Sequence, residues 1–277
     1  MSFDPRRTPV NDRVVADWLA DRFPDRLPVE PDMCYVARPV IDLSLAPGGR
    51  RDRQLLYGMP FELLETRDGQ AFGLCAPADY VGWVDVTALA PASDRGEPTD
   101  LVTSRQTHAY AQPDFKSPDR LALPHLCILA CGESRGRFTE TELGWVPTAH
   151  LVQHPDPDPV AIAALYLGTP YLWGGNSCFG IDCSGLVKNA LMHAGRDAPG
   201  DSDLQQDILG ETLPHGTPPQ RGDLLFWKGH VAWVADPDTL IHANAHHMAV
   251  ACEPIADAIA RIAAQGDGPV TRHARLT

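Results

Sequence analysis

The sequence predicts an α+β protein in which two small all-β barrels precede a mixed domain of helices and strands. From residue 35 onward, short apolar or alternating runs are separated by turn residues, a pattern typical of small antiparallel barrels. The tripeptide Gly-Trp-Val occurs at residues 82–84 and again at 144–146, which indicates an internal repeat. Beyond residue 158, helical apolar spacing and later β-branched runs predict the mixed domain.

Residues 1–30 are expected to form a helical arm packed on the body of the protein. An amphipathic helix is predicted over residues 11–23, with Asn11 as N-cap, and prolines at positions 24 and 28 should end it. The apolar face of this helix would carry Val14, Val15, Trp18 and Leu19.

The two barrels are expected at residues 31–92 and 99–152. Residues 80–89 align with residues 142–151, although two unrelated strands sharing one tripeptide would also explain the match. Within the first barrel, the arginine-rich residues 50–53 are expected to form a solvated loop. Proline-rich stretches should act as links between domains, because alternate prolines block both helix and central strand. These stretches are residues 91–100 and 154–159.

The mixed domain is expected to cover residues 158–277. Helices are predicted at residues 160–168, from 183 onward and at 253–264, and a short helix capped by Ser202 or Asp203 is predicted to end at Gly210. Strands are predicted from the β-branched and aromatic runs at residues 223–227, 231–235 and 240–243.

A candidate nucleophile lies at the predicted start of the helix that begins at Cys183. The glycine-rich residues 174–180 lead into Asp182, which occupies an N-cap position, so Cys183 falls in the first turn. Unpaired N–H groups and the helix dipole favour a thiolate there, so the pKa of Cys183 is expected below the usual value of about 8.5. The alternative is a small buried core residue, the commoner role of a lone cysteine.

Two histidines could complete a catalytic group. A thiolate needs a proton shuttle and a third group that orients it. His230 opens the predicted strand 231–235, and His242 lies on the next strand beyond a turn at residues 236–239. They could be neighbours across a hairpin, but the sequence leaves the register open.

These motifs, in this order, resemble the NlpC family of papain-like cysteine peptidases over residues 158–250. The matching segments are residues 171–175 with 182–185, 221–226, 229–231 and 241–243. The resemblance implies that Cys183 is the nucleophile, His230 the base and His242 the orienting residue. The two barrels resemble bacterial SH3-like domains, and a subgroup of the family carries two of them before the peptidase.

That subgroup acts on free cell-wall peptides with an N-terminal L-alanine. The resemblance implies cleavage between γ-D-glutamate and a diamino acid, with release of L-Ala-D-Glu during peptidoglycan recycling. It also implies a set of substrate-binding residues, together with an acid from the first barrel: Asp42, Asp52 or Glu62. The set is Tyr80, Tyr171, Trp173, Asp182, Ser184, Asp201 and Ser202. Tyr80 could instead be a barrel surface aromatic, and Asp201-Ser202 could simply cap a helix.

Composition argues against several other classes of protein. The net charge of −13 comes without a basic stripe, so no nucleic-acid partner is expected. The N-terminal residues lack the apolar core of a signal peptide, and no apolar run reaches the roughly 18 residues of a membrane span. With seven cysteines, an odd number, reduced thiols and a cytoplasmic location are expected, with no membrane partner.

No cofactor or metal is expected. Zinc is the alternative suggested by the many Cys and His residues, but Cys127 and Cys131 lack a nearby second pair, and His246 and His247 are adjacent. Two other functions stay open: a peptidoglycan endopeptidase acting on intact wall, and a peptide-binding module whose peptidase domain is inert.

Overall fold

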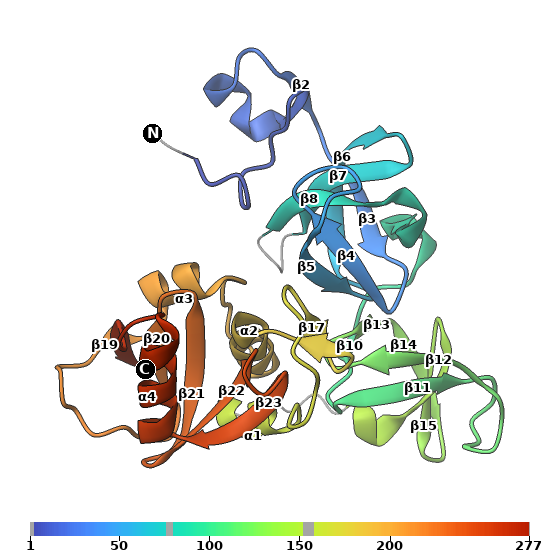
Figure 1. The fold of residues 1–277 in the computed structure, drawn as a ribbon. Helices are drawn as coiled ribbons and strands as arrows, with labels where there is room; N and C mark the ends of the chain where they lie inside the picture. The colour runs from blue at the N-terminus through green and yellow to red at the C-terminus, as the bar shows by residue number, and fades with distance from the viewer. Residues whose placement is uncertain (1–2, 76–79, 152–157, 277) are drawn as a thin grey trace. The chain divides into compact units, whose positions relative to one another are not determined.

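The computed structural model describes residues 3–75, 80–151 and 158–276, and the chain divides into two compact units (Figure 1). The N-terminal unit is Met1–Gln153 and the C-terminal unit is His154–Thr277. Among the described residues, no helix has both the length and the apolar character needed to cross a bilayer. The predicted link at residues 154–159 lies outside the described residues except for Asp158 and Pro159.

The N-terminal unit contains two antiparallel sheets. The first has the strand order β5-β4-β8-β7-β6-β3-β9. Its strands are β3 (Asp32–Val36), β4 (Val40–Ser44), β5 (Arg51–Leu56), β6 (Pro60–Arg67), β7 (Gln70–Cys75), β8 (Tyr80–Asp85) and β9 (Leu89–Pro91). The second has the order β12-β11-β16-β15-β14. Its strands are β11 (Gln106–Tyr110), β12 (Asp119–Pro124), β14 (Cys131–Arg135), β15 (Phe138–Thr141) and β16 (Gly144–Pro147), and β10 (Asp100–Leu101) pairs with β13 (Ile128–Leu129) beside it.

The internal repeat is confirmed by the positions of the two Gly-Trp-Val strands. β8 lies between β4 and β7, and β16 lies between β11 and β15. Trp83 pairs with Ser44, and Trp145 pairs with Tyr110. Each strand is followed directly by a 3-10 helix, η3 (Val86–Ala88) or η5 (Thr148–His150). The tripeptide therefore occupies the same place in two equivalent sheets.

Two predictions for the N-terminal unit are wrong. Instead of one helix over residues 11–23, the arm forms β1 (Val14–Ala16), the 3-10 helix η1 (Asp17–Arg22) and β2 (Leu27–Val29), with β1 and β2 parallel. The β-branched valines of β1 are buried, and burial in a strand outweighs the helical spacing. The expected loop at residues 50–53 also differs, because β5 begins at Arg51 and the Arg53 guanidinium lies 4.7 Å from the ring centroid of Tyr80.

The C-terminal unit is built on an antiparallel sheet of order β19-β24-β20-β21-β22-β23. Its strands are β19 (Glu211–Thr212), β20 (Asp223–Trp227), β21 (His230–Asp236), β22 (Thr239–Asn244), β23 (Ala249–Pro254) and β24 (Arg272–Arg275). The helices are α1 (Pro159–Ala164), α2 (Cys183–His193), α3 (Ser202–Ile208) and α4 (Ile255–Gln265), and β17 (Asn176–Ser177) pairs with β18 (Gly180–Ile181) before α2. The short helix starts at Ser202 with Asp201 at its N-cap position. The predicted caps, Ser202 and Asp203, lie one and two residues beyond it.

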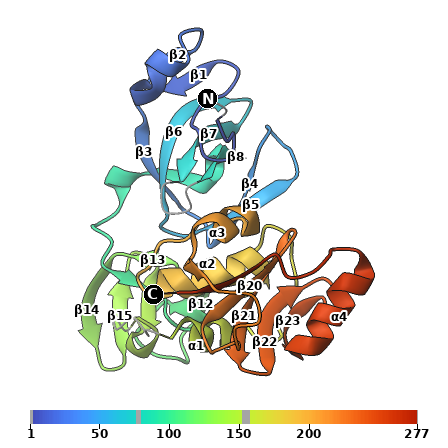
Figure 2. The same ribbon diagram turned by 90° about the vertical axis from the view of Figure 1, so that its left-hand side faces the viewer.

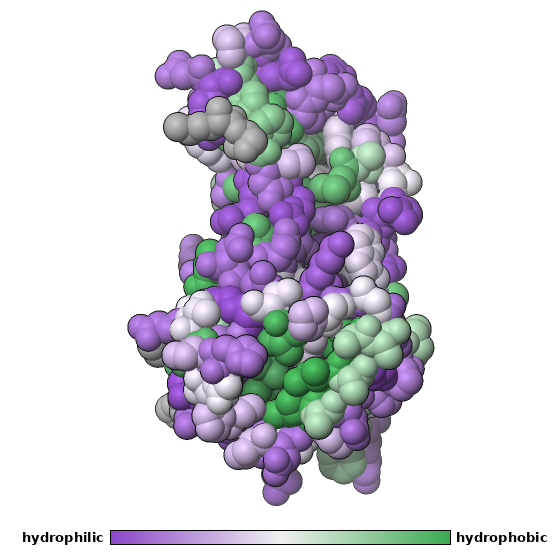
Figure 3. Space-filling model, turned by 60° about the vertical axis from the view of Figure 1, so that its left-hand side comes forward, coloured by the Kyte–Doolittle hydropathy of each residue, from purple (hydrophilic) through white to green (hydrophobic). Residues whose placement is uncertain are grey.

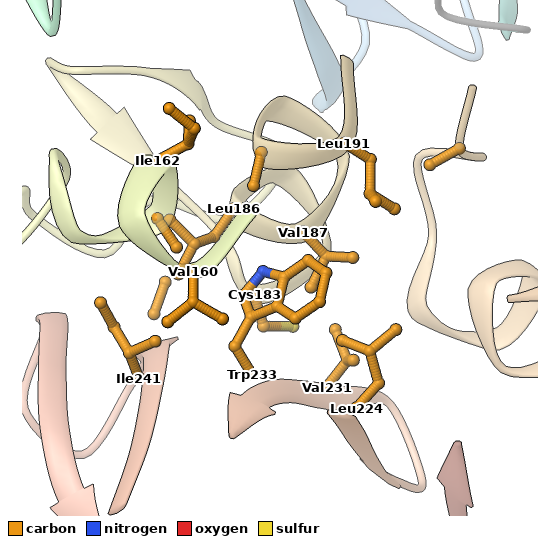
Figure 4. Close-up of a cluster of buried hydrophobic side chains, with 14 of the residues drawn as sticks. Val160, Ile162, Cys183, Leu186, Val187, Leu191, Leu224, Val231, Trp233 and Ile241 are labelled. Carbon is orange, nitrogen blue, oxygen red and sulfur yellow. The ribbon is translucent and has the colours of Figure 1, made fainter. Parts of the chain in front are cut away.

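Both faces of this sheet are covered, because successive side chains of a strand point to opposite faces. Val231 and Trp233 of β21 pack with α1 and α2, as Figure 4 shows. The alternate residues Ala232 and Val234 pack with α4. Figure 2 shows α2 and α4 on different sides of the sheet. The first face holds Cys183 in its apolar cluster, so the helix with the candidate nucleophile is fixed by the main core of the unit.

An apolar pocket of about 420 Å³ opens on the α4 face of the sheet. Leu225, Ile255, Ile259 and Val270 line it, and all four belong to the cluster that packs on α4. Figure 3 shows apolar surface gathered on one part of a mostly polar face. This pocket contains none of the predicted site residues.

Candidate active site

Cys183 opens α2, and the Asp182 carboxylate caps that helix as predicted. Asp182 Oδ1 accepts from the Gly185 N–H at 2.7 Å and from Ser184 Oγ at 3.1 Å. Asp182 Oδ2 accepts from the Gly174 N–H at 2.8 Å. One buried carboxylate therefore joins the glycine-rich loop to the start of the helix and fixes the position of Cys183.

Glycine is required at position 185 by a close approach of the same loop. A Cβ at Gly185 would lie 2.5 Å from the carbonyl oxygen of Gly175 and 2.6 Å from Asn176 Oδ1. The first of these is a backbone atom, which a side-chain movement cannot relieve. The motif Asp-Cys-Ser-Gly thus supplies a cap, a thiol and the space for the loop.

The pKa of Cys183 contradicts the prediction of a low value. The backbone N–H groups of Val231, Ser184 and Cys183 itself favour the thiolate, in the predicted direction. Burial and the nearby Asp182 carboxylate outweigh them and raise the pKa of Cys183 to about 12. The resting group is therefore a neutral thiol, because only 7% of the residue is exposed and water cannot solvate the anion.

The register left open by the sequence brings the two histidines together. Trp233 pairs with Ile241, which places His230 and His242 diagonally across β21 and β22. His230 Nε2 and His242 Nδ1 lie 2.9 Å apart. The Val231 N–H acts on the Cys183 sulfur, so the start of β21, where His230 lies, is near the thiol. Because Nε2 of His230 contacts His242, Nδ1 is the nitrogen of His230 that is left to exchange a proton with the thiol.

Both histidines are neutral near pH 7. Burial lowers the pKa of His230 to about 3 and that of His242 to about 4. Burial lowers the pKa of His242 even though the Glu253 carboxylate raises it. A neutral thiol can pass its proton to a neutral imidazole within reach of it when a substrate carbonyl is attacked.

Glu253 and Arg261 extend this group and were missed by the sequence analysis. His242 pairs with Ala251, so Glu253 lies diagonally beyond it on β23, and Glu253 Oε2 is 3.1 Å from His242 Nε2. Arg261 on α4 donates Nε to Glu253 Oε1 at 2.9 Å and Nη2 to Oε2 at 2.6 Å. These bonds hold the pKa of Glu253 at about 2. Residues 249–254 do not alternate between apolar and polar, so an inward acid could be recognised only once the β22–β23 register was known.

The same residues include a possible group of metal ligands. Donor atoms of His242, His247 and Glu253 lie within 4.8 Å of one another. However, Arg261 binds both oxygens of Glu253 and places a positive charge where a cation would have to bind. The geometry therefore fits a hydrogen-bonded network better than a metal centre.

Comparison with known proteins agrees with this arrangement. The model of the NlpC/P60 family matches residues 168–262, a range that includes Cys183, His230, His242 and Glu253. The C-terminal part of the chain is thus similar to the NlpC/P60 family. A second model, the bacterial dipeptidyl-peptidase SH3 domain, matches residues 44–89 of the first barrel.

Curated relatives are similar to this chain over parts of their length. Dipeptidyl-peptidase 6 of Lysinibacillus sphaericus is 38% identical over 85 residues, which are 31% of this chain and 31% of the relative. A gamma-D-glutamyl-L-lysine dipeptidyl-peptidase of Bacillus cereus is 31% identical over 202 residues, 64% of this chain and 60% of the relative. The chain thus spans less than two thirds of either relative.

A solved structure supports the fold. The crystal structure of an NlpC/P60 family protein from Bacillus cereus has a TM-score of 0.71 and 20% identity, and the match covers 80% of this chain and 94% of that one. The predicted α+β class, with SH3-like barrels before a papain-like domain, is confirmed.

The predicted substrate-binding residues of the C-terminal unit differ in burial and in their neighbours. Tyr171 lines a cavity of about 500 Å³ together with His230, Lys228 and Arg261. Burial, and then the nearby Cys183, raise the pKa of Tyr171. Trp173 is 56% exposed and could contact a ligand directly.

The other predicted contacts lie at helix starts or in the N-terminal unit. Asp182 and Ser184 are buried and hydrogen-bonded to each other, a positioning arrangement. Asp201 and Ser202 begin α3, which is tied to α2 because Gln205 Nε2 donates to the Ser184 carbonyl at 2.9 Å. Tyr80 lies on β8 of the N-terminal unit, and its contact with substrate stays a prediction.

Proposed function

We propose that this chain is a cysteine peptidase that hydrolyses the γ-D-glutamyl–diamino acid bond of free cell-wall peptides with an N-terminal L-alanine. It would release L-Ala-D-Glu in the cytoplasm during peptidoglycan recycling. The observation that carries the proposal is the 2.9 Å contact of His230 with His242 next to a cysteine that opens a capped helix. The names of the two curated relatives support the choice of bond, because both are dipeptidyl-peptidases and one is named a gamma-D-glutamyl-L-lysine dipeptidyl-peptidase.

The proposed reaction begins with proton transfer from the Cys183 thiol to His230 Nδ1. The sulfur attacks the carbonyl carbon of the γ-D-glutamyl group, and the backbone N–H of Cys183 stabilises the oxyanion. His230 then gives its proton to the leaving amine, and an acyl-enzyme remains. His230 next takes a proton from water, and the resulting hydroxide attacks the acyl carbon. The C–S bond breaks, L-Ala-D-Glu is released, and His230 returns its proton to the Cys183 thiolate.

The cavity beside His230 gives a place for the leaving group. The amine that receives a proton from His230 must lie on the His230 side of the sulfur. The cavity of about 500 Å³ on this side is lined by His230, Lys228, His246 and Asp267. These polar groups suit a diamino acid, which carries both ammonium and carboxylate groups.

Selection of a free N-terminus would come from the other predicted residues. Asp201 would pair with the alanine ammonium, Ser202 would contact the glutamate part, and Tyr80 would block longer N-terminal extensions. Tyr171, Trp173, Asp182 and Ser184 would complete the substrate-binding set.

The test compares L-Ala-γ-D-Glu-meso-diaminopimelate with its N-acetylated form, with Cys183→Ala as control and products followed by mass spectrometry. We expect release of L-Ala-D-Glu from the free peptide alone, and none from the variant. Equal cleavage of both peptides would refute the selection of a free amine. Failure to cleave either peptide would refute the proposed activity.

A further inference from the structure

We propose that Glu253 and Arg261 are positioning residues that set the direction of the hydrogen bonds running through His242 to His230. The inference rests on the proposed function, because it concerns the same proton transfer. Neither residue contacts the thiol in this arrangement. Glu253 acts through His242 and Arg261 acts through Glu253, in a chain of contacts of 2.9 Å, 3.1 Å and 2.6 Å that joins β21, β22, β23 and α4. Arg261 also lines the cavity beside His230, so its substitution should raise KM in addition to its effect on kcat.

The direction follows from the chemistry of each partner. An ionised carboxylate only accepts hydrogen bonds, so Glu253 requires a proton on His242 Nε2. His242 Nδ1 is then an acceptor and requires a proton on His230 Nε2. His230 Nδ1 is left with its lone pair, the form that can take a proton from Cys183. Glu253 therefore selects the tautomers of both imidazoles.

Arg261 keeps Glu253 in the ionised form that this chain needs. Its two donors engage both carboxylate oxygens in a bidentate pair. The Glu253 side chain is 9% exposed and that of Arg261 is 16% exposed, so water screens the pair only weakly. The negative charge of Glu253 also offsets the positive charge of Arg261, which alone would oppose formation of an imidazolium at His230.

The charged and titratable groups around His242 come from several elements. They are His230 on β21, Glu253 on β23, Arg261 on α4 and His247 in the turn before β23. Of these, Glu253 alone favours a positive charge on His242, whereas Arg261 and His247 oppose it. Without the charge of Glu253, the remaining neighbours, Arg261 and His247, both oppose a positive charge on His242.

A matched control exists in the same unit. Asp223 on β20 is a buried carboxylate that also holds a histidine and an arginine, with His273 Nε2 at 2.8 Å and Arg275 Nε at 2.7 Å. This cluster does not include His230 or His242. Asp223→Asn makes the same chemical change as Glu253→Gln, at a site without a link to the proposed reaction.

The experiment measures kcat and KM of the full chain on the tripeptide for wild type, E253Q, R261M, the double variant E253Q/R261M and D223N. We expect E253Q to lower kcat about 10- to 100-fold with little change in KM. The glutamine amide of E253Q has one acceptor oxygen, for which the N–H groups of His242 and Arg261 compete. The positive charge of Arg261 is then no longer balanced. The double variant removes that competition and the opposing charge, so its kcat should exceed that of E253Q. D223N should keep kcat within about two-fold of wild type.

A second measurement needs no substrate. The rate of Cys183 alkylation by iodoacetamide, followed against pH by mass spectrometry, reports how readily the thiol gives up its proton. We expect the E253Q profile to move to higher pH and the D223N profile to stay in place. A wild-type kcat in E253Q, a double variant no better than E253Q, or an unmoved alkylation profile would each overturn the inference. If the wild-type chain cleaves no peptide, the proposed function fails, and the alkylation profiles alone decide this inference.

Discussion

Asp182 both fixes the position of Cys183 and raises the pKa of its thiol. Asp182→Asn should therefore change the free energy of unfolding and the pKa of Cys183 together. Its carboxylate accepts from Gly185 and Gly174 N–H groups and raises the pKa of Cys183. An amide of the same shape keeps one acceptor oxygen and loses the charge. One of the two N–H groups must lose its partner.

The size of the stability change follows from these contacts. Losing a helix N-cap costs about 0.5–2 kcal/mol. Leaving a buried N–H without an acceptor costs about 1–3 kcal/mol. Asp182→Asn loses one of these bonds and should lower the free energy of unfolding by about 1–3 kcal/mol, and Asp182→Ala, which loses both, by about 2–5 kcal/mol.

The assay combines urea unfolding with alkylation of Cys183 against pH. We expect the unfolding midpoint of Asp182→Asn to fall while its alkylation profile moves to lower pH, because the charge that opposes the thiolate is gone. Asp158→Asn is the matched control, since Asp158 caps α1 through the Val160 N–H at 3.0 Å. That variant should lose stability without moving the Cys183 profile. A profile of Asp182→Asn that stays in place or moves to higher pH would refute the electrostatic argument.

Two further predictions concern acid stability and the N-terminal unit. The pKa values of His230 and His242 fall from 6.5 to about 3 and about 4 on folding. Below about pH 6.5 the unfolded chain therefore binds more protons at these two side chains than the folded chain does. The part of the free energy of unfolding that depends on these neutral histidines is fully present above about pH 6.5 and is lost as the pH falls. The urea midpoint should therefore drop between about pH 6.5 and 4, and a midpoint that does not change with pH would contradict the argument. In the N-terminal unit, Arg95 pairs with Glu142 at 3.3 Å with 5% of its side chain exposed, so Arg95→Ala should cost about 2–4 kcal/mol by urea unfolding. Arg135→Ala, which breaks an exposed ion pair with Glu133 and a cation–π contact with Trp145 at 5.2 Å, should cost less than about 1 kcal/mol, and equal costs for the two variants would contradict the argument.

The features that depend on local sequence were predicted well. The helix beginning at Cys183 and its Asp182 cap follow from residue spacing and capping chemistry, and both are present. The strand predicted at residues 223–227 matches β20 (Asp223–Trp227). The proximity of His230 and His242 needed the strand register, which a sequence does not fix when a bulge lies between Val234 and Asp236.

The features that depend on tertiary packing were missed or predicted wrongly. Glu253 meets His242 only through the β22–β23 pairing, and Arg261 reaches Glu253 from a helix on the opposite face of the sheet from α2. The pKa of Cys183 depends on how deeply the thiol is buried, which the capping argument did not include. In the arm, pairing of β1 with β2 decided against the helix.

The order of residues along the chain also bears on how the site assembles during folding. His230, His242 and Glu253 lie on three consecutive strands joined by short turns, and Arg261 follows on the next helix. Such neighbouring pairings close short loops and form fast, at a small cost in chain entropy. Cys183 comes from an earlier helix and meets β21 only through a long-range contact. The base and its supports can therefore form as one folding unit, and the thiol becomes competent only when α2 docks on the sheet.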